Sequence, residues 1–228
     1  MPSILSQLNT LPEWLAANGQ PKFRAAQIKK WLFESRVESF AEMSDLPKAL
    51  REALNRDFTF WSSEVLAHQK SVDGTEKLLL RLVAGGEIEC VLLRDGIRRT
   101  ICVSSQVGCA MGCVFCASGL NGVDRSLTSA EIIEQMLRLS RLLPAEERLS
   151  HIVMMGMGDP LANLNGVLGA LEQATAPDGL GISARRITIS TVGIPPAIRK
   201  LADLDCRYHL AISLHAPNDE LRNRLVPV

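Results

Sequence analysis

With 228 residues, 46% of them hydrophobic, the chain can bury a substantial core, which excludes a disordered tail and predicts one large domain or one domain with a small accessory module. Its 25 basic and 25 acidic residues cancel, so there is no global charge to attract nucleic acid, and any RNA contact must come from local basic patches. No apolar run is long enough to span a bilayer and no signal peptide is recognisable, so we expect a cytoplasmic protein without a membrane partner.

The first 60 residues are predicted to be helical. Apolar residues recur at three- and four-residue spacing over residues 11–54, with breaks at residues 19–21 and at Pro47. Basic residues lie between aromatic ones in this stretch, which suits RNA, although the aromatic side chains could equally form the core of a small bundle. We expect residues 1–60 to be a helical accessory domain that contacts RNA.

Residues 61–95 are predicted to form a short antiparallel β linker. Alternating stretches at 65–70, 77–83 and 87–93 are separated by the turn signals Asp73-Gly74 and Gly85-Gly86.

Residues 96–228 have the pattern of an α/β fold. A strand is predicted over residues 99–105, and Thr128 and Glu131 form a capping-box pattern at the start of an amphipathic helix that ends by Pro144. Three compact apolar runs follow, at residues 151–155, 187–191 and 210–214, which is typical of buried parallel strands with crossing helices. Only four such strands appear before the end, so we expect an incomplete barrel and a chain that is a fragment.

Distinctive residues follow each predicted parallel strand. In α/β folds the ligand collects at the carboxyl ends of the strands, where these residues would meet. They are the cysteine run after the first strand, Gly158-Asp159-Pro160 after the second, Gly193 after the third and His215 to Asn218 after the fourth.

The cysteine run Cys109-x₃-Cys113-x₂-Cys116 offers three thiolates and no fourth. A cuboidal iron–sulfur cluster has four irons, so three protein ligands leave one iron open to a small molecule. Phe115 beside the last cysteine is suited to stacking on an adenine. A zinc site would require a fourth, distant ligand, and the cysteines could also pack simply as small apolar side chains. Six cysteines without a disulfide-type spacing fit a reducing compartment.

Taken together, three segments resemble the radical S-adenosylmethionine (SAM) methyltransferases of the RlmN family, which modify adenine carbon 2 in 23S rRNA and tRNA. The segments are Cys102-Val-Ser-Ser-Gln-Val-Gly-Cys109 with the cysteine run, Gly158-Asp-Pro160, and Ser213-Leu-His-Ala-Pro-Asn218. The resemblance extends over essentially the whole chain. It implies a partial (βα) radical SAM barrel, preceded by the helical domain and the β linker.

The resemblance also implies two cofactors and their ligands. Cys109, Cys113 and Cys116 would hold a 4Fe-4S cluster, whose open iron binds SAM. Gly158 and Asp159 would hold the methionine amino group, and the rest of SAM would contact Ser190, Ser213, Leu214 and His215. The family usually has Glu where this chain has Asp159. On residue pattern alone, Gly158-Asp159-Pro160 is also an ordinary turn, and His215 also fits a hydrogen-bonded histidine at a strand end.

Carbon 2 of adenine is not nucleophilic, and in the family a methylated C-terminal cysteine carries the methyl group to it. Cys102 matches the second cysteine, which releases the product by forming a disulfide, and Glu89 matches the proton acceptor. Cys102 also fits a buried strand residue and Glu89 a solvated face of the linker. No position matches the methyl-carrying cysteine, so we expect this chain alone to bind the cofactors without completing transfer.

The implied partners are 23S rRNA, tRNA and a reducing electron-donor protein, acting on a monomer. Three alternatives stay open: the related adenine carbon-8 methyltransferases of antibiotic resistance, a zinc-stabilised RNA-binding module without redox chemistry, and a truncated, inactive product.

Overall fold

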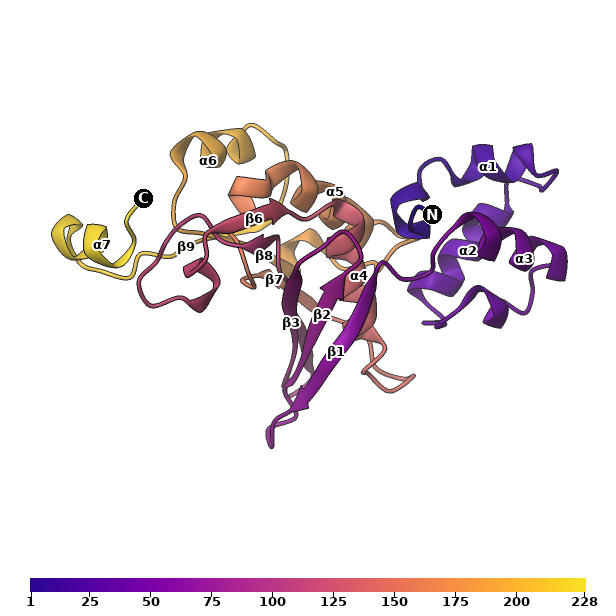
Figure 1. The fold of residues 1–228 in the computed structure, drawn as a ribbon, viewed down its shortest axis with the longest axis horizontal. Helices are drawn as coiled ribbons and strands as arrows, with labels where there is room; N and C mark the ends of the chain where they lie inside the picture. Colours follow the sequence, from indigo (N-terminus) through magenta and orange to yellow (C-terminus); the bar gives the residue numbers. More distant parts are fainter.

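The computed structural model describes residues 1–228, and its first part is a bundle of short helices (Figure 1). The bundle consists of η1 (Ile4–Gln7), α1 (Leu11–Ala17), α2 (Arg24–Phe33), η2 (Phe40–Glu42) and α3 (Lys48–Asp57). Helices stop and restart where expected, with α1 ending before Gly19 and α3 beginning directly after Pro47. Most of the periodic apolar residues are buried here, including Leu15, Ile28 and Leu54.

Three antiparallel strands follow, at the positions that the turn signals predicted. They are β1 (Ser63–Lys70), β2 (Glu76–Leu82) and β3 (Glu87–Asp95), which pair in chain order. Their alternation divides the two faces. Leu78, Leu80, Ile88 and Cys90 lie on the buried face, while Glu89 and Val91 lie on the opposite, half-exposed one.

The parallel strands join this meander in one sheet. They are β4 (Arg98–Cys102), β7 (His151–Met154), β8 (Ile187–Thr191) and β9 (His209–Ile212), and the seven-stranded sheet has the order β1-β2-β3-β4-β7-β8-β9. The associated helical segments are α4 (Ser129–Ser140), η4 (Pro160–Asn163), α5 (Leu164–Thr175), η5 (Ala184–Arg186), α6 (Pro195–Ala202) and α7 (Asp219–Leu225). The predicted α/β class with parallel strands is therefore confirmed, and the meander is continuous with those strands (Figure 1).

The segment between β4 and α4 differs from the prediction. The expected strand over residues 99–105 ends at Cys102, and the chain then forms β5 (Gln106–Gly108), which pairs with β6 (Val123–Ser126) in a separate two-stranded sheet. The cysteine loop and η3 (Ala117–Gly119) lie between these two short strands. The small sheet thus ties together the two ends of the loop that carries the cysteines.

The capping box predicted at the start of α4 is present. Thr128 Oγ1 accepts a hydrogen bond from the Glu131 backbone N–H, and the Glu131 carboxylate accepts one from the Thr128 N–H. Helix α4 ends at Ser140, earlier than Pro144.

Polar contacts fix the helical bundle against the loop after α4. Arg36 donates to the carbonyl oxygens of Leu143, Pro144 and Glu147, and Arg141 donates to Val37 O. The Trp61 ring lies within 4.5 Å of the guanidinium carbons of both Arg138 and Arg141. The bundle is therefore docked by hydrogen bonds as well as by apolar packing, and the cation–π contacts of Trp61 hold the start of the β meander against the end of α4.

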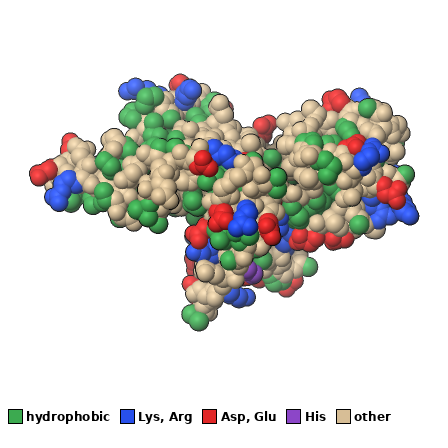
Figure 2. All heavy atoms as spheres, viewed as in Figure 1, with side chains coloured by type: hydrophobic (Ala, Val, Ile, Leu, Met, Phe, Trp, Pro, Cys, Tyr) green, Lys and Arg blue, Asp and Glu red, His purple; other side chains and the backbone are tan.

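The surface carries no single-sign face in the view of Figure 2, where Lys and Arg side chains lie beside Asp and Glu. None of the helices has the length and hydropathy needed to cross a bilayer.

Candidate functional site

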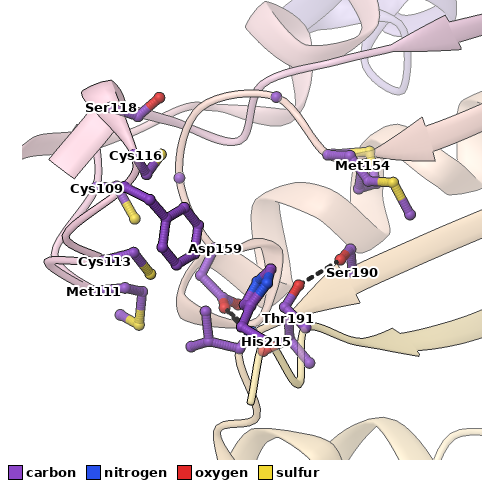
Figure 3. A pocket seen from close by; sticks show the side chains of 16 residues that line it. Cys109, Met111, Cys113, Cys116, Ser118, Met154, Asp159, Ser190, Thr191 and His215 are labelled. Atoms are coloured by element: carbon purple, nitrogen blue, oxygen red, sulfur yellow. Dashed lines mark hydrogen bonds between the residues drawn. The ribbon is translucent and has the colours of Figure 1, made fainter. Parts of the chain in front are cut away.

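A cavity of about 290 Å³ lies at the carboxyl ends of the parallel strands (Figure 3). Residues from the cysteine loop form one side, and residues at the ends of β7 and β8 or in the segments after β7, β8 and β9 form the other. The lining comprises Cys109, Met111, Cys113, Phe115, Cys116, Ser118, Met154, Met155, Gly156, Gly158, Asp159, Ser190, Thr191, Val192, Ser213 and His215. Eight of the eleven predicted site residues are therefore brought together, although they span more than 100 positions of sequence.

The three thiols of the run line the same side of the cavity (Figure 3). Burial raises the pKa of the Cys109 and Cys113 thiols, and the neighbouring cysteines add to the effect for both. Thiols in such a position hold their protons until a cation compensates the thiolate charge, which a metal centre does on binding.

The thiols fit a cluster better than a single ion. No group of three or more His, Cys, Asp or Glu side chains in the chain is arranged to hold one metal ion. A mononuclear zinc site requires its sulfurs to converge at about 2.3 Å from one point. In a cuboidal cluster each thiolate binds a different iron, so three thiols that line one wall do not have to converge on one point. This arrangement does not favour the zinc alternative.

The loop after β7 is pressed against the segment that precedes the cysteines. Gly158 has φ +87°, and a Cβ at this position would lie 2.5 Å from the Gln106 side chain. The next residue, Asp159, is 4% exposed and its carboxylate accepts three hydrogen bonds from the chain itself. Glycine is therefore needed at 158 for both conformation and space.

Two serines and a histidine complete the opposite wall. Ser190 Oγ lies 3.4 Å from Ser213 Oγ, across the ends of β8 and β9. His215 has φ +62°, which is rare for a residue with a side chain, and its ring centroid lies 4.7 Å from that of Phe115. Leu214 does not line the cavity, and its side chain is largely exposed.

Glu89 and Cys102 lie beside the cavity rather than in its lining. Cys102 pairs with Val91 of β3 and Val153 of β7, so Cys102 and Glu89 share the sheet face that also carries Ser190. Burial raises the pKa of the Cys102 thiol, against the effect of a hydrogen bond from the backbone N–H of Met155. Met155 itself lines the cavity, so Cys102 adjoins one of the lining residues.

The Glu89 side chain is 45% exposed, and its Oε1 lies 2.7 Å from Lys77 Nζ. The carboxylate is therefore accessible and paired with a cation, so Glu89 is neither a fully buried acid nor a freely solvated residue of the meander.

Several lining residues had no signal in the sequence. Met154 and Met155 look like core residues of the apolar run 151–155, and Met111 lies among the small residues of the cysteine loop. Position at a strand end adjoining Gly193 was the one sequence signal that marked Thr191.

Comparisons with known proteins agree with this geometry. The family model of the radical SAM superfamily matches residues 103–227, and that of the ribosomal RNA large subunit methyltransferase N-terminal domain matches residues 6–59. A crystal structure described as a radical SAM methyltransferase from Sphaerobacter thermophilus superposes with a TM-score of 0.93 at 40% identity, covering 100% of this chain and 67% of that one.

Two relatives are described as probable dual-specificity RNA methyltransferase RlmN. The protein from Rhodopirellula baltica is 67% identical over 221 residues, covering 97% of this chain and 60% of the relative. The protein from Bacillus thuringiensis is 46% identical over 229 residues, covering 100% of this chain and 63% of the relative. The chain thus spans less than two thirds of the length of these relatives.

Fold, cysteine loop and sequence together define a radical SAM protein. Within that superfamily the chain belongs to the RlmN family, whose members use a 4Fe-4S cluster and SAM.

Proposed function

We propose that this chain is the cofactor-binding part of a methyltransferase acting on carbon 2 of adenosine in 23S rRNA and tRNA. One observation carries the proposal: three thiols of one loop and the polar strand-end residues Ser190 and Ser213 line a single cavity. The RlmN relatives support the RNA substrates, and they favour carbon 2 over carbon 8.

The chain's own residues supply the frame for the reaction. Cys109, Cys113 and Cys116 hold the cluster, and Phe115 and His215 enclose the cavity beside it. Gly158, Ser190, Ser213 and Leu214 are the remaining SAM-binding residues carried over from the family motif. When bound, the two cofactors supply one-electron cleavage of a sulfonium bond and hence a carbon radical that abstracts hydrogen.

Cys102 and Glu89 act at the edge of this cavity. Cys102 adjoins the lining residue Met155, and it is the thiol that would form a disulfide with a sulfur substituent brought to the cavity from elsewhere in the full protein. Glu89, on the same sheet face, accepts the proton, and its Oε1 lies 2.7 Å from Lys77 Nζ. Cys90 is not a candidate for the disulfide-forming thiol, because it is buried on the opposite face of the sheet.

The helical domain, residues 1–60, contributes the RNA contact, residues 61–95 connect it to the barrel, and residues 96–228 form the barrel part. Phe23 is a large apolar side chain that is 59% exposed on this domain, and the Arg24 guanidinium carbon lies 5.1 Å from its ring centroid. Replacing Phe23 by Ala should weaken binding of a tRNA transcript by roughly 5- to 150-fold, the value of one lost stacking contact. Unchanged binding in a fluorescence-anisotropy titration would remove this part of the proposal.

The partners and setting follow from the same proposal. A reducing protein supplies the electron, a monomer suffices because one chain provides all three thiols, and ribosomal and transfer RNA place the reaction in the cytoplasm.

Anaerobic reconstitution tests the central claim. The chain should take up about four irons and four sulfides and turn brown. Cys113→Ala should lose most of this uptake, whereas Cys206→Ala, a half-buried thiol outside the cavity, should keep it. A colourless chain that binds zinc, or equal iron uptake in both variants, would refute the cluster. Mass-spectrometric mapping of the methyl group made by the full-length protein then distinguishes carbon 2 from carbon 8.

A further inference from the structure

The Asp159 carboxylate is occupied by donors of the chain itself. Its Oδ1 accepts a hydrogen bond from the Leu161 backbone N–H at 2.9 Å, and its Oδ2 accepts two, from Thr191 Oγ1 and from the Val192 N–H, each at 2.9 Å. A carboxylate has about four acceptor positions, so three of them are filled. The side chain is also 4% exposed.

These bonds join two loops that are distant in sequence. Asp159 precedes η4, in the loop after β7, while Thr191 and Val192 are at the end of β8. Thr191, 2% exposed, extends the link, because its Oγ1 also accepts the Gly193 N–H at 3.0 Å. One acid therefore sets the turn that follows Ser190, whose side chain faces the cavity.

The backbone of Asp159 is held from the other side. Its N–H donates to Gln106 Oε1 at 3.2 Å, and the preceding Gly158 leaves no room to move toward Gln106. With the backbone fixed there, the length of the acid decides what it reaches. Aspartate spans the distance to Thr191 and Val192 with ordinary 2.9 Å bonds, and one further methylene would have to displace them or turn elsewhere.

We propose that Asp159 is a positioning residue: its carboxylate clamps the loop after β7 to the end of β8, and it influences SAM binding by shaping this cavity wall, without contacting SAM. The inference rests on the proposed function for the identity of the ligand. It assigns to the side chain a different role from the amino-group contact expected from the family motif, and it makes Thr191 part of the same device.

Thr191→Val, Asp159→Asn and the double variant test the clamp, with Thr188→Val as a control on the same strand, since the structure shows no hydrogen bond from the Thr188 side chain. Two quantities are measured: the melting temperature of the iron-free chain, and the dissociation constant of SAM for the reconstituted chain, followed by the change in the electron paramagnetic resonance spectrum of the reduced cluster. Because these hydrogen bonds form without ligand, the melting temperature of the iron-free chain should fall by roughly 3–12 °C in each single variant.

Each single variant should raise the dissociation constant of SAM at least tenfold. The double variant should have the same dissociation constant as Asp159→Asn within a factor of two, because both changes break the same link between the two loops. Thr188→Val should alter neither quantity. Weaker binding in Asp159→Asn with wild-type binding in Thr191→Val would overturn the proposal in favour of direct contact. Lower melting temperatures with unchanged binding would overturn it in favour of a purely structural tie.

If Asp159→Asn fails to fold, Thr191→Val alone decides, since it keeps the side-chain volume and removes only the hydroxyl. A failure of the proposed function would look different: the unaltered chain would bind neither cluster nor SAM, while the melting temperatures would still report the clamp.

Discussion

Gln135 offers the sharpest test of how helix α4 stabilises the segment that precedes the cysteine loop. It lies on α4, is 0% exposed, and its amide bridges the backbone of Ser104, where the chain leaves β4 for the cysteine loop. Oε1 accepts the Ser104 N–H at 2.8 Å and Nε2 donates to Ser104 O at 3.0 Å. Replacing Gln135 by Met keeps the helix propensity and approximate volume and leaves both Ser104 groups buried without that partner.

The magnitude follows from the two lost bonds. A buried backbone group left unsatisfied costs about 1–3 kcal/mol, so the two together should lower the free energy of unfolding by roughly 2–6 kcal/mol. Urea denaturation of the iron-free chain, monitored by circular dichroism, measures this change. Gln173→Met on α5 is the matched control because the buried Gln173 Oε1 makes no hydrogen bond, so this substitution breaks no bond of that atom and should not lower the free energy of unfolding. Equal effects of the two substitutions would show that the bridge adds nothing to stability.

Two further predictions concern other supports of the site. Gly158→Ala should lower the free energy of unfolding of the iron-free chain by about 2–5 kcal/mol, because φ is +87° and a Cβ would meet Gln106. The control is Gly122→Ala, where φ is +70° but the space around a Cβ is open, so this variant should show only the smaller cost of backbone strain. Equal melting temperatures of the two variants would contradict this prediction. Burial opposes ionisation of Glu131, but the hydrogen bonds from Arg125 and Thr128 outweigh it and hold its pKa below the ordinary 4.5, so its stabilisation is complete above pH 4.5 and is lost as pH falls through the lowered pKa. The melting-temperature gap between wild type and Glu131→Gln should accordingly narrow from pH 7 to pH 3, and a gap that widened in acid would reverse the assignment.

The positions of most strands were predictable because each has a local signature. Short apolar runs bounded by Gly, Pro or charges gave β7, β8 and β9 within two residues, and Thr128 with Glu131 marked the start of α4. The pair β5 and β6 had no such signature. Each is only three or four residues long, and their pairing depends on Gln106, Val107 and Gly108 meeting partners that lie 15 to 20 residues away.

The residues that form the site were predictable, but the hydrogen bonds that their side chains make were not. Three thiols in eight residues are visible in any reading of the chain, and the carboxyl ends of parallel strands collect ligand-binding residues in every sheet of this kind. Whether an acid at such an end is free to meet a ligand depends on donors that the fold brings to it from elsewhere. Asp159 is filled by Thr191 and Val192, 32 and 33 positions away, while Glu89 remains accessible beside Lys77.

This contrast has a consequence for relating sequence motifs to chemistry. A motif fixes which functional groups are present, and the residues that satisfy them lie outside it, on other strands. Two carboxylates carried over from one family pattern thus have opposite environments here: Asp159 is buried with three hydrogen bonds from the chain, and Glu89 is half-exposed with one cation. Because three of the four acceptor positions of Asp159 are filled and the Glu89 carboxylate is accessible, we expect Asp159 to hold the cavity wall and Glu89 to be the carboxylate that accepts a proton.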